Sequence, residues 1–264
     1  MQGKRLDIFI TEKGLVESRS LAQRIIMAGE VRVNGEIIDQ ASKKVNLNDE
    51  IIINQRPQFV SRGGEKLQSA LINFKLENLN GKICADVGSS TGGFTDCLLQ
   101  NNAKKVYSID VGYGLIHWKL RNDPRIVLME KTNARFIVKL PETIDLVTID
   151  ASFISLKKLI PVVQKWLKDS GEIIALVKPQ FEAGREISAK GKGVIREPQI
   201  HREVLNNIIL FAQAKGFYIK GVISSHLLGP KGNREFFLYL GLSNTINSNQ
   251  SIDINKLLSK IEGL

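Results

Sequence analysis

Seven apolar runs of strand length, most of them preceded by an amphipathic helical segment, occupy the chain from Leu67 to residue 243. This alternation constrains the fold more than any other feature, because strands that alternate with helices form a mostly parallel sheet with helices on both faces. We therefore expect an α/β fold whose main part is a doubly wound, seven-stranded, Rossmann-like sheet. The runs are KICADVG, KVYSIDVG, RIVLME, DLVTIDASF, EIIALVKPQF, YIKGVISS and EFFLYLGL.

The first run leads into a glycine-rich turn, CADVGSSTGGFTDCLL, between Cys84 and Leu99. Such a loop presents backbone N–H groups and a helix N-terminus to a ligand at the strand ends. It lacks the Lys-Ser or Lys-Thr pair of a triphosphate-binding loop and the second glycine of a dinucleotide loop. Asp86 precedes the glycines, and a carboxylate there favours a cationic ligand over pyrophosphate. With its sulfonium and ammonium groups, S-adenosyl-L-methionine is the cofactor we expect; for Asp86 alone, a helix-capping role is the alternative.

Two later positions extend this expected site. Asp110 ends the second strand, where an acidic residue hydrogen-bonds ribose hydroxyls. Asn133 follows the third strand and could contact the adenine edge, with an ordinary turn as the alternative. Together, DVGSSTGG and SIDVG resemble motifs of adenosylmethionine-dependent methyltransferases. The expected cofactor-binding residues are Asp86, Gly88, Ser89, Ser90, Thr91, Gly92, Gly93, Phe94, Asp110, Val111 and Asn133.

The first sixty residues predict a small α+β unit. Two helical segments are followed by VRVNGEII, whose Asn34-Gly35 pair is a strong hairpin signal, and by the strand DEIII. In order, LDIFI, SRSLAQRIIMAGEVRVNG and NDEIII resemble the small RNA-binding domain first described in the fourth protein of the small ribosomal subunit. The resemblance implies RNA contacts from basic residues of the helix pair, although a solvated helix face explains any single one equally well. These residues are Lys4, Arg5, Arg19 and Arg24.

The domain organisation follows from composition. Residues 1–58 form the predicted RNA-binding domain, and residues 59–66, next to Pro57 and with Gly63-Gly64, are expected to be an interdomain linker. Residues 67–243 form the predicted methyltransferase domain. Residues 244–264 begin as a polar linker and end in a predicted short helix.

Polar residues that interrupt the ends of three later runs are the candidates for chemistry. Asp150 follows one strand, Lys178 ends another and Glu235 begins a third. A lysine at the end of a buried strand has two explanations. It pairs with a carboxylate and stabilises the fold, or its pKa is lowered so that it takes part in a reaction. With Lys66, these residues match in type and order the lysine, aspartate, lysine and glutamate tetrad of FtsJ-like RNA 2'-O-methyltransferases.

The full layout resembles the TlyA family of rRNA 2'-O-methyltransferases, many of which carry a historical hemolysin label. The matching segments are SRGGEKL, DVGSSTGGFTD, DVGYG, TIDASFISL, LVKPQFE and NREFFLYL. The resemblance implies 2'-O-methylation of ribose, with cytidine as the nucleotide, in small- or large-subunit rRNA. It implies that Lys178 is the general base, that Asp150 orients it, and that Lys66 and Glu235 position the ribose.

Charge supports a polyanionic partner, ribosomal RNA within ribosomal subunits. The net charge is +10, and nearly all of the surplus lies beyond residue 60, because the first sixty residues hold nine basic and eight acidic side chains. The segment from Phe181 to Glu203 places basic residues among glycines and is expected to be a mobile basic loop where RNA enters, with a disordered surface loop as the alternative. The further RNA-binding candidates are Arg62, Arg185, Lys190 and Lys192.

Several classes are disfavoured. No apolar run reaches the roughly 18 residues of a membrane helix, and the N-terminus lacks the apolar core of a signal peptide, so we expect a cytoplasmic protein without membrane contact. The two cysteines and three scattered histidines form no metal motif, and no metal is expected. The alternatives are a non-catalytic RNA-binding ribosome-assembly factor and, from the family label alone, a cytolysin. The sequence leaves the oligomeric state and the modified subunit open.

Overall fold

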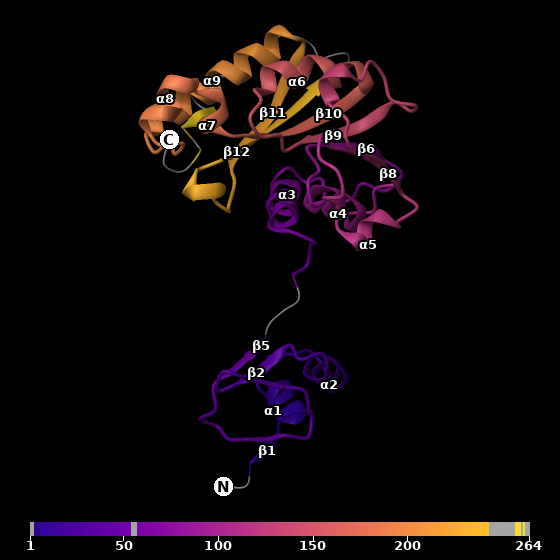
Figure 1. Cartoon of the computed structure of the whole chain (residues 1–264), viewed down its shortest axis with the longest axis vertical. Coiled ribbons are helices and arrows are strands. Elements are labelled where there is room, and N and C mark those ends of the chain that lie inside the picture. Colours follow the sequence, from indigo (N-terminus) through magenta and orange to yellow (C-terminus); the bar gives the residue numbers. More distant parts are fainter. Residues whose placement is uncertain (1–2, 54–56, 243–256, 260, 262–264) are drawn as a thin grey trace. The chain divides into compact units, whose positions relative to one another are not determined.

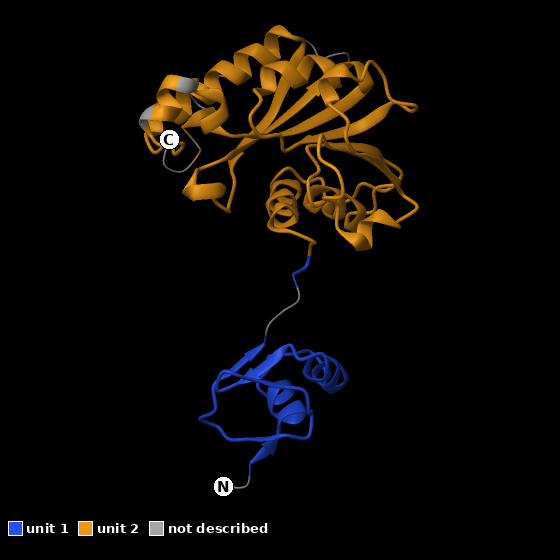
Figure 2. Ribbon diagram, viewed as in Figure 1, with its two compact units in different colours: residues 1–58 blue, residues 59–264 orange. Residues whose placement is uncertain are grey.

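The computed structural model describes residues 3–53, 57–242, 257–259 and 261, and the chain divides into two compact units (Figure 1, Figure 2). The units comprise Met1–Gln58 and Phe59–Leu264. Most of the segment 244–264, with its predicted polar linker and helix, lies outside the described residues. Leu258 and Ile261 are described, and both are buried against the core of the second unit. No helix among the described residues is long and apolar enough to cross a membrane.

The first unit packs two helices against short strands. Its apolar core takes residues from both helices, where Leu6, Ile10 and Ile26 are fully buried. Asn34 and Gly35 have φ values of 51° and 85°, as a two-residue type I′ hairpin requires, so the expected hairpin is present. The elements are β1 (Lys4–Arg5), α1 (Leu6–Glu12), α2 (Arg19–Met27), β2 (Val31–Val33), β3 (Glu36–Ile38), β4 (Lys44–Val45) and β5 (Ile51–Ile53).

The second unit is built on one seven-stranded sheet in the order β11-β12-β10-β9-β6-β7-β8. The pairs among β10, β9, β6, β7 and β8 are parallel, whereas β12 runs antiparallel to both of its neighbours. All seven expected strands are present, and the predicted fold class is confirmed. The strands are β6 (Ile83–Val87), β7 (Lys105–Ile109), β8 (Ile126–Met129), β9 (Ile144–Ile149), β10 (Leu167–Val177), β11 (Phe217–Ser224) and β12 (Phe236–Leu242).

Helices cover both faces of this sheet (Figure 1). One face carries α6 and α9, whose buried residues share a core with the strands, and the other carries α3 and α4 with a second core. The elements are α3 (Arg62–Asn73), α4 (Gly93–Gln100), α5 (Trp118–Arg121), η1 (Ala134–Phe136), α6 (Leu156–Val163), η2 (Gln164–Trp166), α7 (Pro179–Glu182), α8 (Arg185–Lys190), α9 (Pro198–Ala214) and η3 (Pro230–Gly232).

The segment expected to be a linker, residues 59–66, lies within the second unit, and α3 begins inside it. Gly63 and Gly64 lie in the first turn of α3, so the pair does not interrupt regular structure here. A Cβ added at Gly64 would lie 2.3 Å from the buried side chain of Phe59. A Cβ added at Gly93 of α4 would lie 2.8 Å from the backbone nitrogen of Gly64. Gly64 is therefore explained by the close approach of Phe59, and Gly93 by the close approach of the start of α3.

Candidate active site

The glycine loop after β6 is folded tightly against the neighbouring strand end. Gly88 and Gly92 have φ values of 85° and 93°, and Ser90 has 49°. A Cβ at Gly88 would lie 2.5 Å from the carbonyl oxygen of Asp150, so only glycine fits this position. The loop thus lies against the end of β9, where a candidate catalytic residue begins the next segment.

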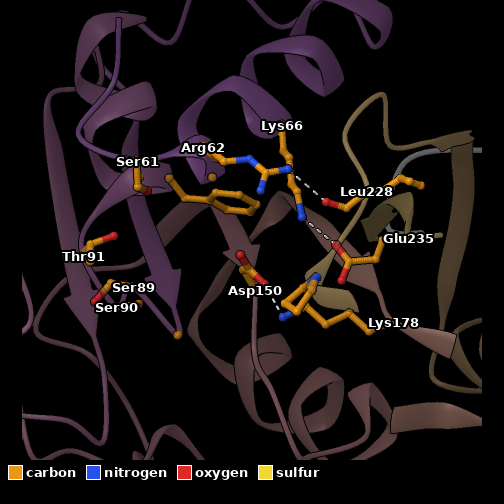
Figure 3. Close-up of a pocket in the computed structure, with 15 residues that line it drawn as sticks. Ser61, Arg62, Lys66, Ser89, Ser90, Thr91, Asp150, Lys178, Leu228 and Glu235 are labelled. Carbon is orange, nitrogen blue, oxygen red and sulfur yellow. Dashed lines mark hydrogen bonds and ion pairs between the residues drawn. The ribbon is translucent and has the colours of Figure 1, made fainter. Parts of the chain in front are cut away.

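A pocket of about 440 Å³ opens beside this loop, within the second unit. It brings together residues of α3, the glycine loop and the ends of β9, β10 and β12 (Figure 3). All four candidate catalytic side chains line it. The lining residues are Ser61, Arg62, Gly63, Lys66, Gly88, Ser89, Ser90, Thr91, Gly93, Phe94, Asp150, Lys178, Leu228, Pro230 and Glu235.

Sheet topology explains why residues far apart in sequence meet here. Asp150 directly follows β9 and Lys178 directly follows β10, and these parallel strands end at the same edge of the sheet. Glu235 directly precedes β12, which is antiparallel, so the start of β12 lies at that same edge, with Phe236 opposite Val177. An aspartate, a lysine and a glutamate from three strands therefore lie around one pocket.

Two ion pairs connect the four side chains (Figure 3). Lys66 Nζ donates to Glu235 Oε2 at 2.7 Å, and Lys178 Nζ lies 2.6 Å from Asp150 Oδ1. The exposed fractions are 10% for each lysine side chain, 0% for Glu235 and 25% for Asp150. Both pairs are largely shielded from water, where electrostatic interactions are strong and an unpaired charge is unfavourable.

Neighbouring groups hold these pairs in place. Lys178 Nζ also donates to Ser152 Oγ at 3.1 Å. Gln180 Nε2 approaches the second oxygen of Glu235 at 3.4 Å. A Cβ at Gly229 would lie 2.1 Å from Glu235 Oε1, so the backbone of Gly229 packs directly on the carboxylate. Glu235 is thus fixed in orientation from three sides.

Asp86 does not line this pocket. Its side chain is fully buried beneath the loop, where Thr95 Oγ1 donates to one oxygen at 2.7 Å and Thr148 Oγ1 to the other at 3.0 Å. Burial raises the pKa of Asp86 to about 7, and the nearby charge of Asp150 adds to the shift. The sequence argument that its carboxylate lies in the crevice and attracts a cation is not supported by this geometry. Asp86 instead ties the start of α4 to β9.

Most of the other expected cofactor residues line the pocket or lie next to its lining. Residues 88–91, Gly93 and Phe94 line it, and Phe94 also belongs to the apolar core. Asp110 accepts hydrogen bonds from the backbone nitrogens of Ser90 (2.8 Å) and Gly112 (2.7 Å), and each oxygen of this partly exposed carboxylate retains capacity for a further donor. Val111 is exposed, and Gly92 packs against Leu120 and Ile116. Asn133 caps η1 by accepting from the backbone nitrogen of Arg135 at 3.1 Å, the turn role named as the alternative.

In the first unit, three of the four basic candidates have partners within the unit. Arg5 and Arg19 both donate to the fully buried Asp7, at 3.0 and 3.1 Å, and these partners hold the pKa of Asp7 far below its usual value. Lys4 pairs with Glu12, and Arg24 is exposed. These arginines therefore have a structural role whatever else they contact.

In the second unit, Arg62 lies at the pocket rim, where Nη2 donates to the carbonyl oxygen of Leu228 at 3.3 Å. The segment expected to be a basic loop contains α8. The side chains of Arg185 and Lys190 in that helix lie outside the described part, while Lys192 is exposed.

A second pocket, of about 870 Å³, adjoins the first and shares Lys178, Pro230 and Glu235 with it. Sequence reasoning missed most of its residues, among them Ser152, Gln180 and Phe153, which is 90% exposed at a φ of 62°. All three lie within three residues of Asp150 or Lys178. Their position directly after a catalytic candidate is the sequence signal that indicates them.

The fold and the four clustered side chains define an FtsJ-like methyltransferase: this family matches residues 59–242, and the S4 domain matches residues 4–51. The chain is 43% identical over 263 residues (98% of this chain, 93% of the relative) to a Bacillus subtilis (strain 168) protein provisionally designated rRNA methyltransferase YqxC. It is 40% identical over 242 residues, 89% of each chain, to the 16S/23S rRNA (cytidine-2'-O)-methyltransferase TlyA of Mycobacterium tuberculosis (strain ATCC 25618 / H37Rv). A solved Streptococcus thermophilus structure with a provisional hemolysin designation matches with a TM-score of 0.72 at 40% identity, covering 98% of this chain and 95% of that one. The chain belongs to the TlyA family, as its motifs predict.

Proposed function

We propose that this protein transfers a methyl group from S-adenosyl-L-methionine to a ribose 2'-hydroxyl of ribosomal RNA, with cytidine as the target nucleotide. The observation that carries the proposal is the meeting of Lys66, Asp150, Lys178 and Glu235 around one pocket beside the glycine loop. The named activity of the Mycobacterium tuberculosis relative supports the substrate and the nucleotide.

The loop side of the pocket fits the cofactor. Residues 88–91 line it, Asp110 has acceptor capacity for ribose hydroxyls, and Asp150 contributes a carboxylate that would attract the positively charged sulfur of the cofactor. When bound, the cofactor supplies a methyl group on a positively charged sulfur. Asp86 acts beneath the loop, where its hydrogen bonds with Thr95 and Thr148 hold the loop's flanking elements together.

Each of the four clustered side chains has its own role in the proposed reaction. Lys178 would act as the general base: once it has given up its own proton, its amine would accept the proton of the ribose 2'-hydroxyl and leave the oxygen as the nucleophile for the methyl group of the cofactor. Asp150 orients Lys178 and stabilises the ammonium that forms, at the 2.6 Å separation seen here. Lys66 and Glu235 fix the ribose, since Glu235 is held by Lys66 on one oxygen and by Gln180 on the other. The pocket is shielded enough for these polar contacts to be strong.

RNA is the partner that the rest of the chain supports. The S4 domain match covers residues 4–51, and the exposed Arg62 and Lys192 lie at the two pockets. In the first unit, the candidates Lys4, Arg19 and Arg24 are exposed. Positive side chains near the site favour the phosphate backbone in a salt-dependent manner.

The test uses labelled S-adenosyl-L-methionine with separated small and large ribosomal subunits that lack the modification. Incorporation into ribose in either rRNA that is lost with Lys178→Met supports the proposal. Cofactor binding without incorporation into either subunit would instead favour an RNA-binding assembly factor.

A further inference from the structure

Two chain segments that follow adjacent parallel strands lie side by side next to the proposed active site. Residues 150–156 follow β9, and residues 178–182 follow β10. Each begins with a member of the Asp150–Lys178 pair. The contacts between the segments are Asp150 Oδ1 to Lys178 Nζ (2.6 Å), Lys178 Nζ to Ser152 Oγ (3.1 Å), the Phe153 and Phe181 rings (4.9 Å between centroids), and two hydrogen bonds from Ser155 and Leu156 to Glu182.

Glu182 closes the far end of this arrangement. Its Oε2 accepts from Ser155 Oγ at 2.6 Å, and its Oε1 accepts from the backbone nitrogen of Leu156 at 2.7 Å. Ser155 is the N-cap of α6, and it also accepts from the backbone nitrogen of Lys157. A carboxylate at a helix N-terminus is favourable, because it satisfies N–H groups that have no partner within the helix. The contact is therefore a firm connection between α7 and α6.

The connection affects Lys178 because the short helix α7 begins directly after this residue. Pro179 starts α7 directly after Lys178, and the helix is only four residues long. A helix this short has little stability of its own, so its orientation depends on what holds its end. Glu182 is that end, and it is not among the residues that line either described pocket.

We propose that Glu182 is a positioning residue, which sets the distance and direction between Lys178 Nζ and Asp150 by clamping the two segments together. The inference rests on the proposed function of Lys178 as the base. It gives Glu182 a part in turnover without contact with cofactor or RNA.

The first test compares Glu182→Ala with Glu182→Gln in the full-length protein. Glutamine keeps an oxygen for the Leu156 nitrogen and an amide that donates to Ser155 Oγ, so this variant retains near-normal activity. Alanine removes both hydrogen bonds, and we expect kcat to fall about 10- to 100-fold while KM for rRNA and Kd for the cofactor change less than about threefold. Glu142→Ala is the matched control. It removes a carboxylate that accepts from Lys105 and Tyr107 away from both pockets, and it lowers the melting temperature without lowering kcat.

All assays are run well below the melting transition of each variant. Unchanged kcat in Glu182→Ala, or an equal loss in Glu182→Gln and Glu182→Ala, would overturn the proposal. Equal losses of kcat in Glu182→Ala and Glu142→Ala would reduce Glu182 to a general structural role.

A second measurement does not depend on methyl transfer. The rate at which an amine-reactive acylating reagent labels Lys178 is followed by mass spectrometry in the same variants. We expect Glu182→Ala to change this rate at least threefold, while Glu182→Gln and Glu142→Ala leave it unchanged. An unchanged rate in Glu182→Ala rejects the clamp. If the wild-type protein methylated neither rRNA, the proposed function would fail, and the labelling result would still decide on the clamp.

Discussion

Lysine–carboxylate pairs occur at both edges of the central sheet, and the two edges use them differently. At the edge where the parallel strands begin, Lys105 pairs with Glu142 at 2.6 Å and Lys168 with Asp145 at 2.7 Å. At the edge where they end, the pairs are Lys66–Glu235 and Lys178–Asp150, at 2.7 and 2.6 Å. The distances are alike, so distance does not separate the two kinds of pair.

The exposure of the lysine separates them. Lys105 and Lys168 are 34% and 41% exposed, whereas Lys66 and Lys178 are each 10% exposed. Exposed pairs contribute about 0 to 1 kcal/mol to stability. A buried pair loses its hydration, so a protein that contains one is often no more stable than a protein with apolar residues of the same size in its place. The presence of a buried ion pair beside a pocket is therefore better explained by a role in the reaction than by a contribution to the free energy of unfolding.

The largest expected effect tests this contrast on a single strand. Lys178 follows β10 at the pocket edge, and Lys168 lies near its start. Lys178→Met should lower the rate of rRNA methylation about a thousandfold, with cofactor affinity nearly unchanged, because it removes the proposed general base. Lys168→Met should leave the rate within about twofold, since the Lys168 side chain is 41% exposed and lies at the opposite edge of the sheet from the pocket. Single-turnover methylation and calorimetric cofactor titration measure both quantities. Comparable rate losses in the two variants would contradict the distinction between the edges.

The next effect concerns the stability of the second buried pair. Glu235→Ala leaves the Lys66 charge buried without its partner, and we expect a loss of about 3 to 5 kcal/mol in the free energy of unfolding. The double variant Glu235→Leu/Lys66→Met should recover most of that stability but not the activity. Denaturant unfolding and methylation assays test the two parts, and recovery of turnover in the double variant would show that the pair is structural.

Asp86 provides a third case, a buried carboxyl group that accepts hydrogen bonds from two threonines and not from a lysine. The pKa of Asp86 is raised to about 7 from about 4, so the folded state favours its protonated form. Its contribution to stability is complete below pH 4 and is lost as the pH rises through 7. Asp86→Asn should therefore reduce the loss of stability between pH 5 and pH 8 by on the order of 2 kcal/mol. Thermal unfolding at both pH values measures this, and an unchanged pH dependence in the variant would contradict the assignment.

The smallest effect is expected at the solvent-exposed edge. Lys105→Met removes the partner of Glu142, which keeps its hydrogen bond from Tyr107 at 2.7 Å. Stability should fall by less than about 1 kcal/mol, and less still at high salt, with no change in methylation. A loss similar to that of Glu235→Ala would remove the distinction on which the comparison rests.

Much of this arrangement could be predicted from sequence. The seven strands, the Asn34–Gly35 hairpin and the placement of Asp150, Lys178 and Glu235 at strand ends all follow from local patterns. Strand order did not follow from those patterns, and it was the antiparallel course of β12 that brought Glu235 to the correct edge.

Contacts that depend on packing between elements were not predictable in this way. Asp86 lies in a strand that is buried on both faces, so periodicity gave no sign that its side chain would meet Thr95 and Thr148 rather than the pocket. Arg5 and Arg19 gave the same signal as RNA-binding residues, because their buried partner Asp7 is recognised only once both helices are in place. The clamp by Glu182 was missed for the same reason.

The position of β12 also has a consequence for synthesis on the ribosome. In the sheet, β11 pairs with β12 and not with β10, yet β11 leaves the ribosome first. Until β12, the last strand of the described residues, has been synthesised, β10 and β11 lack the strand that lies between them, and Glu235 directly precedes that strand. A chain that stops before residue 235 contains the glycine loop, Asp150 and Lys178, but it has no glutamate to pair with Lys66, so the four proposed catalytic residues are complete only when β12 is about to be made.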